Sequence, residues 1–190
     1  MTDTTTLMTR KRLFTDRLVE AANITEASYK KGKAYQSDTF DFLIGDYDLK
    51  VQNHDLETGE VLSERIARMT SYYLEPQRML ANKWTAYDPE NRTKVHFGMN
   101  LRTFVAEENR WNTVWLADGQ GIPGVSFSFI DEGEQIAARF SYEYPDVGSV
   151  STVLRFFNIA ESAFEWDHQI SLDDGETWDV LQTHVANVAV

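Results

Sequence analysis

The sequence contains no cysteine, only four prolines and no long run of apolar residues. The lack of cysteine excludes a disulfide framework, a thiolate metal site and a cysteine nucleophile. No window approaches the roughly 20 apolar residues that a helix needs to cross a bilayer. Positive charge is also scarce, with 18 Lys and Arg against 30 Asp and Glu and a net charge of -12. Long-range repulsion of phosphate therefore argues against nucleic acids and anionic membranes as partners.

The remaining composition is that of a globular protein. Of 190 residues, 42% are hydrophobic and 25% charged, which fits one domain with a full core and room for an internal pocket. The basic residues Arg10 to Arg12 are followed by the broken run Leu13 to Arg17, which does not resemble a secretory signal. We therefore expect a cytoplasmic protein.

The N-terminal segment is predicted to be helical. Apolar residues recur at helical spacing over Thr9–Ala27. The first 35 residues hold seven basic and four acidic side chains, a net +3, and the remainder carries −15. We expect a helical segment over residues 1–36 that packs against the following domain or against a second subunit in a homodimer.

From Phe40 onward the hydrophobic pattern has a period of two, which is typical of β-strands. Turn sequences recur between the strands, for example Asp55 to Gly59, Asp131 to Gly133 and Asp173 to Gly175. The pattern predicts a mainly β domain over residues 37–190, with about ten antiparallel strands in an up-and-down meander. So many strands must hide their edges, and we favour a closed barrel over a sandwich.

Two segments resemble uncharacterised bacterial lipocalin-like (calycin) domains. Phe40 to Leu49 is similar to their opening strand, with Tyr47 where the family has Trp, and Phe164 to Trp178 is similar to their closing hairpin. The resemblance implies a cup-shaped antiparallel barrel. It implies no particular reaction.

The closing hairpin supplies the candidate catalytic residues. Strand alternation places Trp166 and His168 on one face and Trp178, Gln182 and His184 on the face of the next strand. A three-residue register in the Asp173 to Gly175 loop would bring His168 near Gln182, whereas a two-residue register would separate the two histidines. A histidine in apolar surroundings stays neutral near pH 7, as a general base requires, although it can also be a hydrogen-bonded core residue.

Aromatic residues on the predicted strands form the candidate ligand-binding wall. They are Trp84, Trp115, Trp166, Trp178, Phe140 and Tyr142. Such residues give flat apolar walls with a few donors, which suits an aromatic, terpenoid or polyketide-like molecule.

The other polar residues are expected to be structural. His96 shares a face with Asn100 and Arg102, and we interpret this face as solvated; His54 precedes a turn and is also expected to be solvated. Asp46, Asp48 and Glu64 are expected on the rim or the outer face. No histidine pair has zinc spacing, so no metal or cofactor is expected, although His168 or His184 could serve as a single haem ligand as in some related barrels.

Three functions remain open from the sequence. The first is cofactor-free acid–base chemistry on a small apolar molecule, of the isomerase, cyclase, lyase or hydrolase type, with His168 as acid or base and His184 or Gln182 orienting it. The second is a non-catalytic carrier or sensor with the same barrel. The third is an interaction module that docks through the basic helix.

Overall fold

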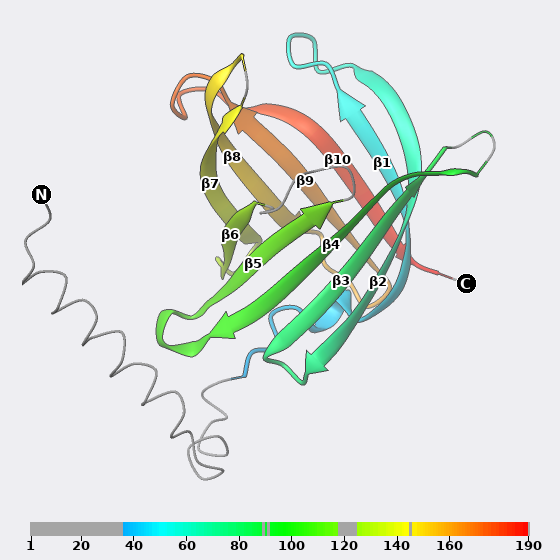
Figure 1. The fold of residues 1–190 in the computed structure, drawn as a ribbon, viewed down its shortest axis with the longest axis vertical. Coiled ribbons are helices and arrows are strands. Elements are labelled where there is room, and N and C mark those ends of the chain that lie inside the picture. Colours follow the sequence, from blue (N-terminus) through cyan, green and yellow to red (C-terminus); the bar gives the residue numbers. More distant parts are fainter. Residues whose placement is uncertain (1–35, 89, 91, 118–124, 145, 190) are drawn as a thin grey trace, which may run out of the picture. The chain divides into compact units, whose positions relative to one another are not determined.

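The computed structural model describes residues 36–88, 90, 92–117, 125–144 and 146–189. The predicted helix over 9–27, and the predicted segment 1–36 apart from its last residue, lie outside these residues. Figure 1 shows the strands of the described part, which enclose a barrel. The strands are β1 (Gly45–His54), β2 (Val61–Glu75), β3 (Met79–Tyr87), β4 (Lys94–Val105), β5 (Arg110–Ala117), β6 (Ser126–Asp131), β7 (Ile136–Tyr144), β8 (Gly148–Phe157), β9 (Ala163–Ser171) and β10 (Asp179–Val188).

The sheet is a closed antiparallel meander, as predicted. Each strand pairs with its neighbours in the chain, and β1 pairs with β10 to complete the ring. In that closing pair Leu49 lies opposite Ala186 and Val51 opposite His184. Because residues opposite each other share a face, the register of each pair fixes which side chains point inward.

The predicted turns join the strands where the sequence places them. Asp55 accepts hydrogen bonds at Oδ1 from the backbone N–H groups of Glu57 and Thr58, both 2.9 Å, before Gly59 at φ 72°. In the β9–β10 connection the N–H of Thr177 donates to Asp173 Oδ1 at 2.9 Å. These side-chain acceptors close the loops locally and hold the hairpins in register.

One end of the barrel is filled by aromatic packing. A short 3₁₀ helix, η2 (Asp41–Leu43), follows Phe40, and both Phe40 and Leu43 are fully buried. The Phe40 ring makes edge-to-face contacts with Trp111, Phe129 and Phe156, with centroids 5.5 to 5.8 Å apart. The cluster stabilises the folded protein by burying apolar surface, and each aromatic pair adds roughly 0.5–1.5 kcal/mol beyond that burial. It anchors the chain entering β1 against three other strands.

The predicted outer carboxylates lie outside the barrel. Asp46, Asp48 and Glu64 are exposed, and Lys50 Nζ lies 2.8 Å from Glu64 Oε2. In the part of the chain that the structure describes, no helix has the length and apolar character needed to span a bilayer.

Candidate functional site

The inward faces of β9 and β10 carry the predicted histidines. Gln182 lies opposite His168 and His184 lies opposite Trp166, so all four side chains share one face. Because His184 also lies opposite Val51 of β1, which is buried, that face is the interior. The register that joins His168 to Gln182 is therefore the one observed.

Trp178 does not reach this face, so its predicted interior position is wrong. A bulge at Leu181 shifts the register between Val180 and Gln182, and Trp178 precedes the first residue of β10. The residue is 40% exposed, and its indole donates from Nε1 to the Gly175 carbonyl at 3.2 Å. Strict alternation across the hairpin fails here because the bulge inserts one extra residue.

His184 lies at the centre of the interior cluster. Its ring stacks on Trp166, with centroids 3.5 Å apart and planes at 15°, and its residue is 2% exposed. Nε2 donates to Gln182 Oε1 at 3.4 Å, and Gln182 Nε2 in turn donates to Asn53 Oδ1 at 2.7 Å. This assignment leaves Nδ1 as the acceptor, and Nδ1 is buried with no partner among the described protein groups.

Burial keeps both imidazoles neutral. Desolvation lowers the pKa of His168 to about 4, against a smaller opposing effect of the Asp167 charge. Burial, with a further contribution from nearby His168, holds the pKa of His184 well below its ordinary value. Nε2 of His168 also has no partner among the described groups. The pair therefore offers uncharged nitrogens in an aromatic environment at pH 7.

A tryptophan wall faces His184 from β3 to β5. The Trp84 ring lies 6.4 Å from the His184 ring and 6.4 Å from Trp115, and His96 lies 5.6 Å from Trp84. The Trp115 indole covers Gly98, where a Cβ would overlap its six-membered ring. Glycine at 98 thus provides the space for the indole. His96 belongs to this inward cluster, and its predicted solvated position is wrong.

Phe140 and Tyr142 belong to a second inward cluster. Phe140 stacks on Phe127 with centroids 4.7 Å apart, and Tyr142 lies 6.2 Å from Phe140. Both lie opposite inward residues of β8, namely Thr152 and Val150. The predicted wall residues other than Trp178 are therefore inward, but they fall into two groups.

The polar face of β4 points into the barrel, which the sequence interpretation missed. Arg102 is 3% exposed and lies opposite Thr113 and Leu80, both buried. Beside it, Asn100 Nδ2 donates to Asn82 Oδ1 at 3.2 Å, while Asn100 Oδ1 is buried without a partner among the described groups. The signal that could have revealed this face is the cross-strand pattern, since the neighbouring strands place Leu80 opposite Arg102 and Trp115 opposite Asn100.

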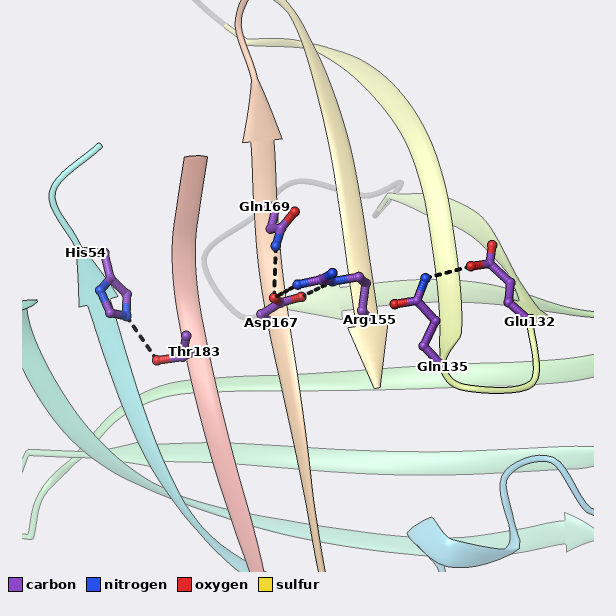
Figure 2. Close-up of polar contacts among 7 residues, drawn as sticks. All are labelled: His54, Glu132, Gln135, Arg155, Asp167, Gln169 and Thr183. Atoms are coloured by element: carbon purple, nitrogen blue, oxygen red, sulfur yellow. Dashed lines mark hydrogen bonds and ion pairs between the residues drawn. The ribbon is translucent and has the colours of Figure 1, made fainter. Parts of the chain in front are cut away.

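On the outer wall, several polar groups of β8, β9 and β10 are paired. Arg155 donates from Nε to Asp167 Oδ1 at 2.9 Å and forms an ion pair with the same carboxylate, which also accepts from Gln169 Nε2 at 3.0 Å (Figure 2). His54 Nε2 accepts from the Thr183 hydroxyl at 3.0 Å in the same view. His54 is partly buried through these contacts.

Two hollows of the described part of the chain lie away from the imidazoles. One, of ≈ 290 Å³, lies beside η2 and the β6–β7 turn and includes Asp38, Phe42 and Ile136. The other, of ≈ 570 Å³, includes Lys50, Arg68 and Tyr87. Within the described part of the chain, no group of three or more His, Asp or Glu is arranged to hold a metal ion.

Comparisons with known proteins support the fold. No family model matches the chain, and no curated protein matches it. Among solved structures, Rv2717c from M. tuberculosis is similar with a TM-score of 0.55 and 12% identity over 84% of this chain and 99% of that one. An S-type phycobiliprotein lyase, CPES from Guillardia theta, has a TM-score of 0.53 and 8% identity over 80% and 92%. These similarities establish the ten-stranded barrel, and membership of the calycin family stays a prediction.

Proposed function

We propose that this protein binds a small, largely aromatic molecule in the barrel interior, with His184 and His168 accepting hydrogen bonds from it. The observation that carries the proposal is the buried, unpartnered Nδ1 of His184 between Trp166 and Trp84. An unpaired buried acceptor costs roughly 1–3 kcal/mol. A ligand hydroxyl or N–H would offset that cost, while its ring would lie against the indoles.

The similar barrels are consistent with this proposal. The CPES protein is described as an S-type phycobiliprotein lyase, so at least one barrel of this architecture is a lyase. At 8% sequence identity, this similarity is evidence for the fold and not for a shared activity. The proposal for this chain therefore rests on its own interior residues.

Calorimetric titration with 2-naphthol tests the binding. Its ring suits the indole wall and its hydroxyl can donate to an imidazole. His184→Phe keeps a ring on Trp166 but removes the acceptor, so we expect about 3- to 10-fold weaker binding. Naphthalene lacks the hydroxyl and should bind both proteins alike, and His54→Ala on the outer wall should leave the affinity for 2-naphthol unchanged. The proposal fails if 2-naphthol shows no saturable binding.

Acid–base chemistry on the bound molecule is the second candidate function. The neighbouring neutral imidazoles favour it, since each can hold or release a proton. A base whose pKa is about 4 is fully available at pH 7 but has a low proton affinity, which is why we place binding first. Gln182 would orient His184 through the hydrogen bond between them.

Proton abstraction from 5-nitrobenzisoxazole separates an enzyme from a carrier. Catalysis predicts faster ring opening than by an equal concentration of free imidazole, and a loss of about 10²-fold in His168→Ala with the fold retained. A carrier predicts no acceleration, with the 2-naphthol titration unaffected. Circular dichroism of the variant would verify that the barrel is intact.

A further inference from the structure

Arg102 is a buried cation with no counter-ion among the described residues. The residue is 3% exposed and projects from the inward face of β4. Its Nε and Nη1 atoms have no hydrogen-bond partner among the described protein groups. Desolvation is the sole cause that lowers its pKa, to about 9, so no carboxylate acts on it. An arginine in this position is rare unless it is paired.

Aromatic contacts compensate only part of this cost. The guanidinium carbon lies 5.1 Å from the Phe40 ring centroid and 5.5 Å from that of Phe129. Such cation–π contacts contribute roughly 0.5–2 kcal/mol each, whereas removal of an ion from water costs several kcal/mol. The rings supply no acceptor for the Nε and Nη1 donors of the guanidinium, and in-plane N–H donors of this kind match a carboxylate.

Further unused donors lie around Arg102. Its cross-strand neighbour Thr113 is 1% exposed and has an unpartnered hydroxyl, and Trp111, next along the same face of β5, has an unpartnered Nε1. Donors of this kind are the groups that surround bound anions. Within the described residues, the unpartnered donors around Arg102 therefore outnumber the one unpartnered amide acceptor beside it, Asn100 Oδ1.

We propose that Arg102 binds the carboxylate of an organic acid whose aromatic part lies toward the Trp84 and His184 cluster. The inference rests on the proposed binding function and adds the class of ligand, an aromatic carboxylic acid. Arg102 and the residue opposite Trp84, Gly98, are four positions apart on β4, a separation of about 13 Å along the strand. A molecule of two or three rings with one carboxylate has this length.

The test uses two probes of the same shape, 2-naphthoate and 2-naphthamide, titrated calorimetrically into the full chain. The first is an anion, and the second is neutral and has an NH2 group in place of one carboxylate oxygen. We expect the protein to prefer the anion, and Arg102→Met to weaken 2-naphthoate binding by about 10- to 100-fold while 2-naphthamide changes by less than about threefold. Arg102→Lys keeps the charge and should retain part of the preference. Arg68→Met removes an exposed arginine of β2 and should leave both affinities unchanged.

Thermal unfolding distinguishes a ligand-binding arginine from a structural one. Without a ligand, Arg102→Met should unfold at a higher temperature than the unsubstituted protein, because it replaces an unpaired buried cation by an apolar side chain. A lower unfolding temperature, or equal weakening of both probes, would assign Arg102 a structural role and overturn the inference. If both naphthalenes bind without regard to charge and Arg102→Met changes neither, the anion site is wrong and the binding function stands. If neither probe binds, both proposals fail.

Discussion

The neutral imidazoles make stability depend on pH between 7 and 5. In the folded protein burial lowers the pKa of His168 to about 4 and holds that of His184 well below its usual range. In the unfolded chain both regain an ordinary pKa near 6.5. Unfolding therefore takes up protons below pH 6.5, and the free energy of unfolding falls as pH falls.

The size of this effect follows from proton linkage. Between pH 7 and pH 5, each histidine lowers the free energy of unfolding because it takes up a proton in the unfolded chain. In the folded protein the buried imidazole is still largely neutral at pH 5, so protonation of the folded form contributes little. Each contributes about 2 kcal/mol, so the pair accounts for about 4 kcal/mol. The carboxylate of Asp173, whose pKa is lowered to about 2 by hydrogen bonds from Thr177, loses its contribution at lower pH and does not interfere.

Urea unfolding at pH 7 and pH 5, followed by tryptophan fluorescence, measures the difference. His168→Gln and His184→Gln should each reduce by about half the loss of unfolding free energy between pH 7 and pH 5, whatever the stability of the variant at pH 7. Val185→Ala changes an exposed residue beside His184 and should keep the full dependence. The reasoning is refuted if both glutamine variants lose as much stability as the unsubstituted protein on going to pH 5.

Two further predictions concern packing and pairing. Gly98→Ala should lower the free energy of unfolding by about 1–3 kcal/mol and change the tryptophan fluorescence, because the added methyl group would displace the Trp115 indole. Unchanged fluorescence and stability would contradict the packing of Trp115 on Gly98. Asp167→Asn should lower the free energy of unfolding by about 2 kcal/mol, because it leaves Arg155 without its carboxylate. A double-mutant cycle with Arg155→Met should give a coupling energy of at least about 1 kcal/mol, and additive effects of the two substitutions would argue against the ion pair.

The closed meander could be predicted from the sequence because its signals are local. Alternating residues mark the strands, and Asp and Gly mark turns such as 55–59 and 173–175. The turns after β2 and β4 carry no glycine. There Gln77 at φ 54° and Asn109 at φ 45° take the left-handed conformation, which composition alone does not reveal.

The interior site could be predicted only in part, because polarity is a poor guide inside a barrel. His168 shares its predicted face with the apolar residues Trp166 and Ile170, and the pairing of β9 with β10 places His168 and His184 on one face, as the alternation predicts. Arg102 and Asn100 were assigned to solvent because polar residues are usually exposed, and the pairing of β4 with β3 and β5 overrides that preference. Trp178 fails for another reason, since one bulged residue reverses the alternation.

The contrast between these polar groups of the outer wall and those of the interior supports the proposed ligand site. On the outer wall, Arg155, Asp167 and Gln169 satisfy one another. In the interior, Arg102 and His184 have unpartnered polar atoms, although burial makes each of these costly. Selection for stability alone would produce the reverse arrangement, with apolar residues at both positions. If the proposed ligand supplies the partners of Arg102 and His184, its binding should raise the free energy of unfolding of the barrel.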